Sequence, residues 1–429
     1  MQLHPSCHQS VWPLWQKILF RFCFILFVLY ISPLDWLAEL PVLKYLSQWQ
    51  SDVLDFTVKF ANAHFFHIKD ELVMPGGSGD TSYGWAALET FTWLAIIGSI
   101  IWSILDRKRQ NYAWLNYVLC IGVRYFIAYV ALIYGIEKIF ALQMPFPNAS
   151  QLATPLGDFL PMRLSWMFIG YSTPYQVFSG VMETVVGLLL LNRRTATFGS
   201  VMAFVVFTNV MMLNLSYDIP VKLFSMELTI LSFFLLMQEH RRIIAFFLLN
   251  KEAASCSIYV ASFSKKWLRI ARVVLKCCFV LLAIKIIFDT YGYYKEEHTK
   301  ITMVQPFKQG LYDIAYLKRP ADSTKLWANM AFDNNKSGSF KTEDSILRRR
   351  YGRSYFAYKI DTLQHIIHFN KQMGDSISVF NLSYFGLPNN AILLNGKIGA
   401  DSIALQLNPS LHHFQLAEKQ FHWLSEGNR

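Results

Sequence analysis

The sequence predicts an α-helical membrane protein with about seven transmembrane helices, followed by an antiparallel β-domain. Three observations carry this prediction. The 429 residues are 53% apolar and only 16% charged, a composition that favours a membrane protein. Long apolar segments fill the first two thirds of the chain, and short alternating runs follow. The net charge of +11 lies largely at the ends of apolar segments, so it indicates membrane orientation and not nucleic-acid binding.

Seven segments have roughly the 20 apolar residues that a transmembrane helix needs. The first follows Lys17 and Arg21 and resembles a signal sequence. Because no small-x-small cleavage site follows it, we expect an uncleaved anchor. The predicted spans are residues 18–37, 85–105, 113–141, 174–191, 196–215, 219–237 and 270–288.

Two further segments are expected to lie on the membrane surface. Residues 38–84 begin with an amphipathic stretch that suits a helix on the outer surface. Residues 243–249 are too short to span the membrane and follow Arg241 and Arg242, so we expect them at the inner interface.

Lysine and arginine are distributed unevenly between alternate loops. Loops 106–109, 192–194 and 241–269 are rich in them, whereas 142–173 holds only Arg163 and 216–221 holds none. Positively charged loops stay in the cytoplasm. The chain is therefore predicted to lie in a bacterial inner membrane, with its N-terminus in the cytoplasm and its C-terminal domain in the periplasm.

The C-terminal part has the pattern of an antiparallel β-domain. Residues 355–360 alternate in facing, and runs at 366–369, 377–382, 391–394 and 403–407 are separated by turn residues. This spacing predicts a small barrel or a sandwich of roughly 100 residues. The expected domains are an N-terminal anchor region (1–112), a four-helix core (113–240), a cytoplasmic loop with the last span (241–290) and the β-domain (291–429).

The β-domain has one basic cluster, formed by Arg348, Arg349, Arg350 and Arg353. It indicates either a solvated strand face or contact with anionic lipid headgroups. The six cysteines include no C-x-x-C pair, so neither a disulfide framework nor a thiol relay is expected. His64 and His67 lack a third ligand nearby in sequence, and no metal site is predicted.

Charged residues inside the apolar segments are the candidate functional groups, since each costs on the order of 3 kcal/mol at the centre of a membrane. Arg124 lies about 16 Å from the inner end of its span, and Glu183 about 13 Å from the outer end of its own. Opposite charges at one depth are natural partners. We therefore expect Arg124 and Glu183 to pair or to share a polar cavity, in an architectural or a functional role.

A second polar group is expected in the outer half of the bundle. Tyr134, Glu137 and Lys138 lie on one helix face. Asp218 precedes Pro220 as an N-cap candidate and can pair with Lys222 four residues later. Together they suggest a pocket that opens outward, although caps and structural ion pairs would explain them equally well. The candidate binding residues are Arg124, Tyr134, Glu137, Lys138, Glu183, Asn214, Asp218 and Lys222.

Short motifs within residues 115–240 resemble the DoxX-like membrane proteins. The run from Gly135 to Lys138 is similar to the Gly-x-x-Lys pattern of that family, and Glu183 and Gly187 match the span that follows. The extra spans and the β-domain depart from the compact family form. They look more like the long DoxX-like proteins of Bacteroidetes-type envelopes.

The resemblance implies a link with thiosulfate:quinone oxidoreduction or with responses to oxidative stress. Because the sequence has no redox-cofactor motif of its own, electron transfer would need a quinone bound in the bundle or a partner subunit. Our leading hypothesis is that the bundle binds a quinone or lipid-like small molecule. The alternative is a non-enzymatic scaffold or assembly factor whose periplasmic β-domain docks a partner protein. The sequence assigns no catalytic residue, so whether the chain is an enzyme stays open.

Overall fold

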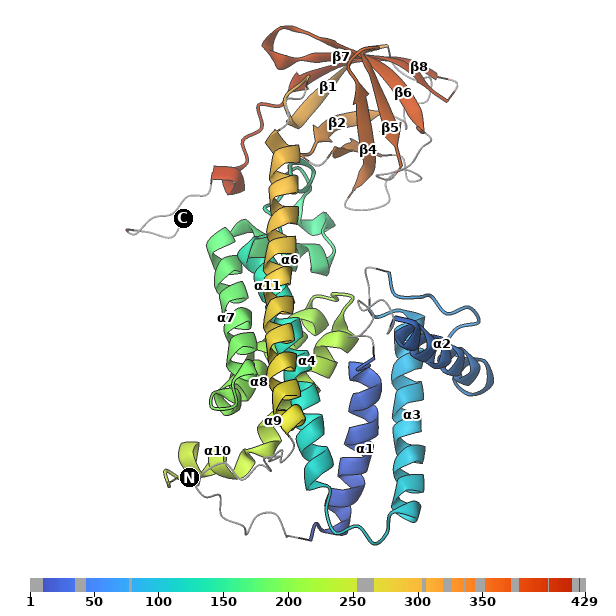
Figure 1. The fold of residues 1–429 in the computed structure, drawn as a ribbon. Coiled ribbons are helices and arrows are strands. Elements are labelled where there is room, and N and C mark those ends of the chain that lie inside the picture. The colour runs from blue at the N-terminus through green and yellow to red at the C-terminus, as the bar shows by residue number, and fades with distance from the viewer. Residues whose placement is uncertain are drawn as a thin grey trace. The chain divides into compact units, whose positions relative to one another are not determined.

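The chain forms two compact units in the computed structural model, which describes residues 11–34, 44–76, 79–252, 266–302, 306–318, 326–334, 336–343, 352–371, 378–399, 401–418 and 424. One unit joins Met1–Ile139 with Val177–Phe288, and the other joins Phe140–Gln176 with Asp289–Arg429. The first is built of helices, and the second contains the β-strands (Figure 1).

Within the described residues, five helices are long and apolar enough to cross a membrane. They are α1 (Leu14–Ile31), α3 (Ser82–Leu105), α4 (Ala113–Ile139), α7 (Thr173–Leu191) and α8 (Ala196–Ser216). Two more helices, α9 (Lys222–Gln238) and α11 (Lys266–Thr302), occupy the sixth and seventh predicted spans. The prediction of membrane helices is confirmed, whereas a total of seven spans stays a prediction.

Each of the two segments predicted to lie on a membrane surface contains a helix. α2 (Lys44–Ala61) continues into a π-helical turn at Asn62–Phe66 and exposes large apolar side chains, with Trp49 64% and Phe56 70% exposed. α10 (His240–Phe247) likewise exposes Phe246 and Phe247. These helices have the composition expected at a lipid interface.

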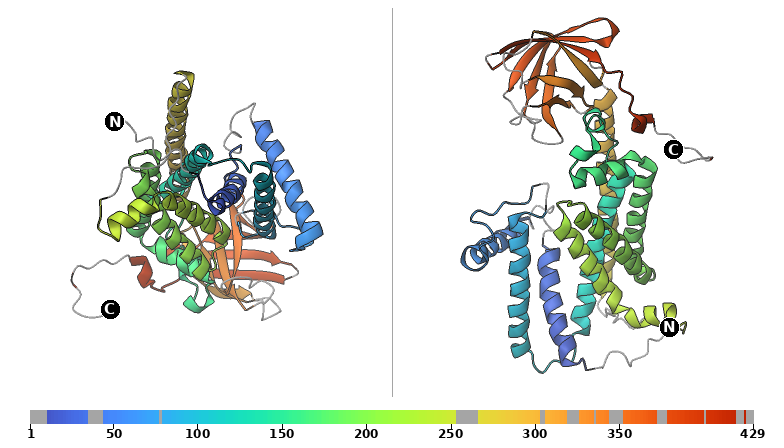
Figure 2. Two further views of the ribbon diagram at one scale, coloured as in Figure 1. Left: turned by 90° about the horizontal axis from the view of Figure 1, so that it is seen from below. Right: turned by 180° about the vertical axis from the view of Figure 1, so that it is seen from behind.

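α1 packs against both α3 and α4, an arrangement that both views of Figure 2 make visible. Arg21 of α1 is completely enclosed, at 2% exposure. Its guanidinium donates to the Tyr112 hydroxyl from Nε (3.0 Å) and Nη2 (2.7 Å), and from Nη1 to Ser103 Oγ (2.7 Å). Tyr112 in turn donates to Asp106 Oδ2 at 2.9 Å. Arg21, which in the sequence is only a charge before a signal-like apolar run, therefore ties α1 to α3 and to the residue that precedes α4.

The described strands close into a barrel of eight, each paired antiparallel with the next in sequence. β8 closes the barrel against β1, with Ile314 opposite Leu407. The prediction of an antiparallel β-domain is confirmed. Of the two predicted forms, a barrel or a sandwich, the domain has the barrel form. The strands are β1 (Gly310–Lys318), β2 (Trp327–Phe332), β3 (Ser337–Thr342), β4 (Arg353–Asp361), β5 (Ile366–Asn370), β6 (Phe380–Gly386), β7 (Ile392–Ile398) and β8 (Asp401–Pro409).

Aromatic and aliphatic side chains fill the barrel interior, as expected when alternate residues of each strand point inward. Phe356 packs edge-to-face against Phe369, with ring centroids 5.1 Å apart, and Trp327 stacks on Phe340 at 4.2 Å. Edge-to-face and offset contacts of this kind add to the stabilisation from burial alone. The interior is thus a packed core at most levels of the barrel.

The predicted outer loop 142–173 is ordered and belongs to the barrel unit. It contains α5 (Ala149–Leu152), a 3₁₀ turn at Leu156–Asp158 and α6 (Pro161–Tyr171). Ser150 donates to the Asp333 carboxylate from its backbone N (3.0 Å) and its Oγ (2.7 Å). Asp333 lies in the turn between β2 and β3, and both Asp333 and Ser150 are buried. The contact therefore anchors this segment to one rim of the barrel.

Arg353 extends the same buried network. Its Nε donates to Ser339 Oγ at 2.7 Å, and Ser339 Oγ donates to Ser150 Oγ at 2.8 Å. Arg353 is only 1% exposed, so placing it on a solvated or lipid-facing surface was wrong. A basic run in sequence does not reveal that one member points inward. Residues Arg348 to Arg350 lie outside the described residues. Burial raises the pKa of Asp333 and lowers that of Arg353.

Candidate functional site

A buried ion pair joins α4 and α7. Lys138 Nζ donates to both carboxylate oxygens of Glu183, each at 2.7 Å. The side chains are 9% and 2% exposed, so both charges have been taken out of water. Such a pair needs short, well-directed hydrogen bonds to offset its desolvation, and the two-oxygen contact supplies them.

Glycines allow the two helices to approach at the ion pair. A Cβ on Gly135 would come within 2.8 Å of the Gly180 carbonyl oxygen, and a Cβ on Gly180 within 2.8 Å of Lys138 Cβ. In both helices a glycine precedes the charged residue by three positions, which places glycine and charge on one face. Small residues at a helix interface let backbones come close in membrane proteins. The Gly-x-x-Lys motif and its counterpart at Gly180 therefore have a structural reason.

Two further predicted residues lie beside the pair. The Tyr134 ring centroid is 5.8 Å from Lys138 Nζ, close enough for a cation–π contact. Glu137 is half-buried and within electrostatic reach of Lys138 and Glu183. Among the described residues Glu137 has no ion-pair partner of its own. The cluster thus combines an ammonium, a phenol and two carboxyl groups, one of which the ammonium already holds.

Arg124 is not the partner of Glu183, and that predicted pair is wrong. α4 and α7 run antiparallel, with Gly135 against Gly180 and Leu132 against Gly187. This register brings Arg124 level with the end of α7 at Leu191 or beyond it, about 12–18 Å along the axis from Glu183. α4 has 27 residues and is about 40 Å long, longer than a hydrocarbon core of about 30 Å. In a helix longer than the hydrocarbon core, a depth counted from the first residue does not fix the position of Arg124 in the membrane.

Arg124 instead packs against its neighbour Tyr125, with its guanidinium carbon 5.5 Å from the ring centroid. Its buried Nε has no hydrogen-bond partner among the described residues. Nearby, Asn116 donates to Gln238 Oε1 at 2.8 Å and joins the start of α4 to the end of α9.

The remaining predicted residues gather at the turn between α8 and α9. Lys222 Nζ lies 2.7 Å from Asp218 Oδ1, so the predicted pairing is confirmed. Asn214 Nδ2 donates to the Val221 carbonyl at 3.4 Å and closes the turn. In the described residues no hydrogen bond or ion pair connects this group to Lys138 and Glu183. The predicted single pocket is thus two separate clusters.

Asp218 does not cap α9, contrary to the prediction. Its backbone is left-handed, with a φ of 50°, and its side chain is 80% exposed and contacts the Lys222 ammonium instead. Asp80 does the capping: it accepts from the backbone N of Lys222 (2.9 Å) and of Leu223 (3.0 Å). Asp80 comes from the segment before α3, more than 140 residues earlier, so local sequence gave no signal for it.

The cluster around Lys138 can bind an uncharged polar group within the membrane helices. An ammonium donates hydrogen bonds to a carbonyl or hydroxyl oxygen, and a phenol can donate or accept. The free carboxyl of Glu137 can hold or release a proton. No group of three or more His, Cys, Asp or Glu side chains that could bind a metal occurs among the described residues.

Comparison with known proteins gives one relative by sequence. A stretch of 124 residues, 29% of this chain, is 30% identical to the uncharacterized protein YwoB of Bacillus subtilis (strain 168) and covers 79% of that protein. No family model matches the chain, and no solved structure matches it. Because the aligned stretch covers most of its relative, the chain belongs to the family of YwoB.

Proposed function

We propose that this protein is a DoxX-like protein of the bacterial inner membrane that binds a quinone or another lipid-like small molecule. The binding site is the cluster around Lys138 and Glu183, and the physiological setting is envelope redox or stress chemistry. One observation carries the proposal: an ion pair is buried where two glycines bring apolar helices into contact.

Architecture alone is a weak reason for such a pair. Replacing a buried ion pair with apolar residues of similar size is often neutral or stabilising. Ionisable groups inside membrane helices more often serve ligands, ions or protons. A quinone or a lipid with a carbonyl group offers an oxygen to the Lys138 ammonium or the Tyr134 phenol. Its apolar tail suits the surrounding helices.

The distribution of lysine and arginine supports the proposed orientation, with the N-terminus in the cytoplasm and the barrel in the periplasm. A cysteine introduced at Arg193 should then resist a membrane-impermeant maleimide in intact cells. One introduced at the barrel surface in place of Lys359 should react.

The binding proposal is tested by native mass spectrometry of the gently purified full chain, with extraction of bound quinones and lipids. We expect one tightly held molecule in the wild type and its loss in Lys138→Met. Lys222→Met is the matched control, because Lys222 is also an ion-paired lysine near a helix end but is 24% exposed and has its shorter contact, 2.7 Å, with the exposed Asp218 and only a 3.5 Å contact with Asp80. A molecule retained by Lys138→Met, or a wild type that holds none, would contradict the proposal.

The second candidate is a scaffold whose barrel docks a partner protein. Large apolar side chains on the barrel favour it: Leu363 is 93%, Val379 66% and Phe385 51% exposed. Exposed apolar residues mark interaction surfaces when they cluster, and Leu363 and Phe385 both lie toward the rim that carries the β4–β5 and β6–β7 turns, whereas Val379 lies at the other rim. This candidate predicts that deleting residues 295–429 abolishes function in cells, while the Lys138→Met variant remains active.

A further inference from the structure

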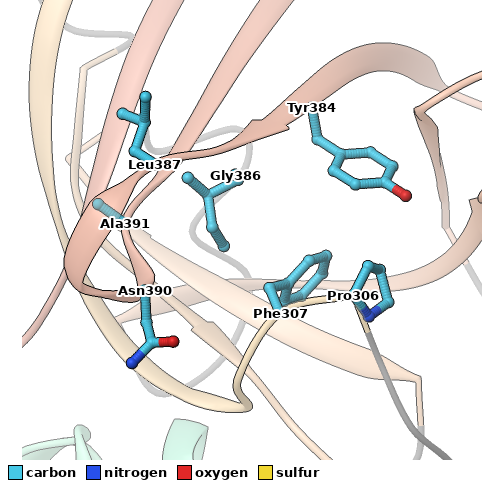
Figure 3. Close-up of a pocket in the computed structure, with 8 residues that line it drawn as sticks. Pro306, Phe307, Tyr384, Gly386, Leu387, Asn390 and Ala391 are labelled. Carbon is cyan, nitrogen blue, oxygen red and sulfur yellow. The ribbon is translucent and has the colours of Figure 1, made fainter.

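The barrel has a hollow at one rim. It measures about 100 Å³ and lies between Phe307, which precedes β1, and the turn from β6 to β7. Tyr384, Gly386, Asn390 and Ile392 contribute to its wall, as Figure 3 shows for the labelled residues. This volume is below the range of about 300–1,000 Å³ found for small-molecule pockets, so a bound molecule also needs the space that the Phe307 ring occupies.

Phe307 separates the hollow from the barrel interior. Its ring centroid is 4.7 Å from that of Phe332 and 6.3 Å from those of Tyr358 and Tyr384. Although only 9% exposed, Phe307 is not part of any strand. Its ring can therefore leave the barrel mouth without breaking the hydrogen bonds of the sheet, and its departure would join the hollow to the interior.

Tyr358 supplies a polar group behind Phe307. It belongs to β4, is 3% exposed and lies among the core side chains. Its buried hydroxyl has no hydrogen-bond partner among the described residues. An unsatisfied hydroxyl costs about 1–3 kcal/mol, and an acceptor on a bound molecule would remove that cost.

The charge near Tyr358 restricts what can bind. Asp333 lies within electrostatic reach of the Tyr358 hydroxyl oxygen. Its carboxylate is in the turn between β2 and β3, at the same rim of the barrel as the hollow. Arg353 offsets part of the Asp333 charge, but Asp333 is the one of the two that acts on the Tyr358 hydroxyl. A carboxylate repels an anion, so an uncharged oxygen is favoured there over a fatty acid anion.

We propose that the barrel takes up one small neutral apolar molecule carrying a carbonyl or hydroxyl oxygen. The molecule enters through the hollow, displaces the Phe307 ring and accepts a hydrogen bond from the Tyr358 hydroxyl. Eight-stranded barrels have an interior that is either filled by side chains or holds one small ligand, and here one displaceable side chain separates the two states. A long-chain alcohol and the head of a neutral lipid share this chemistry.

The test is photolabelling of the full chain in nanodiscs with a diazirine-bearing long-chain alcohol, followed by mass spectrometry of the peptides. We expect saturable labelling of peptides that contain Phe307 or the turn from Tyr384 to Ile392. Unlabelled alcohol should compete, and a fatty acid of equal length should compete at least tenfold less well. Labelling confined to the membrane helices would overturn the proposal.

Two variants sharpen the result. A Cβ on Gly386 meets no atom within 4 Å, so Gly386→Trp can fill the hollow without a backbone clash. It should reduce barrel labelling at least tenfold, whereas Lys359→Trp, on the exposed outer face of β4, should not. Tyr358→Phe keeps the ring and should weaken apparent affinity about tenfold, the effect of one lost hydrogen bond. Unchanged labelling in both Gly386→Trp and Tyr358→Phe would overturn the proposal.

This site is independent of the proposed membrane site. Lys138→Met should leave barrel labelling unchanged, so failure of one proposal is distinguishable from failure of the other.

Discussion

Lys138 and Glu183 each lose their hydration when the helices pack, and only their contact offsets that loss. The two residues are therefore interdependent. Glu183→Leu leaves a buried ammonium without a partner and should lower stability by about 3–5 kcal/mol. The double variant Lys138→Met/Glu183→Leu removes both charges and should recover most of that loss.

Unfolding of the detergent-solubilised protein by SDS or heat measures both effects. If the double variant is as unstable as the single variant, the ion pair stabilises the protein by more than the mutual compensation of two buried charges. Gly122, on the same helix but away from the pair, provides a site for a neutral control substitution, because a Cβ there would meet nothing within 4 Å.

Asp333 makes the barrel's stability depend on pH. Burial raises its pKa in the folded state above the unfolded value of about 3.9. The folded state therefore binds the proton more tightly, so this contribution is fully present below about pH 4. It is lost as pH rises through the raised pKa.

Hydrogen exchange of peptides from residues 327–343, compared between wild type and Asp333→Asn, isolates this effect. The wild type should lose protection relative to Asp333→Asn as pH rises from about 4. Equal pH dependence in the two proteins would show that Asp333 does not control it.

The α4–α7 contact depends on the absence of a side chain at Gly135. A Cβ there would lie 2.5 Å from Thr184 Oγ1, so Gly135→Ala should destabilise the protein by about 1–3 kcal/mol. Gly122→Ala is the matched control in the same helix, because its Cβ would meet nothing within 4 Å. It should be neutral or slightly stabilising. Thermal unfolding measures the stability of both variants. Equal stabilities would contradict a close approach of α4 and α7 at Gly135.

The start of α9 depends on Asp80 and not on Asp218. Asp80→Ala removes two hydrogen bonds to the first turn of the helix and should cost about 1 kcal/mol or more. Asp80→Asn keeps an acceptor and should lose less. Asp218→Ala removes only an exposed ion pair and should change stability by less than about 1 kcal/mol. Denaturant unfolding that ranks Asp218→Ala as the more damaging change would refute this assignment.

Local patterns predicted the long apolar helices and the strands after residue 350, but they gave no sign of the strands between residues 310 and 342. Apolar length defines membrane helices, because a backbone in lipid must satisfy its own hydrogen bonds. Alternation and turn residues likewise predicted the strands near 355–360 and 366–369. The N-cap of α9 could not be predicted, since its partner Asp80 is distant in sequence.

At the scale of the whole molecule, long-range contacts decided what the sequence left open. The choice between barrel and sandwich depends on β8 pairing with β1, at opposite ends of the domain. The partner of Glu183 depends on the register that the glycines set between α4 and α7. The bond from Ser150 to Asp333 joins residues 183 positions apart, and the sequence offered no sign of it.

The central claim is that the Lys138–Glu183 cluster binds a small molecule and is more than a structural support. The most direct measurement is native mass spectrometry of the double variant Lys138→Met/Glu183→Leu beside the wild type, after circular dichroism has shown equal helix content. We predict that the wild type retains a quinone or lipid-like molecule and that the folded double variant has lost it. A folded double variant that holds the same molecule in the same amount would contradict the claim.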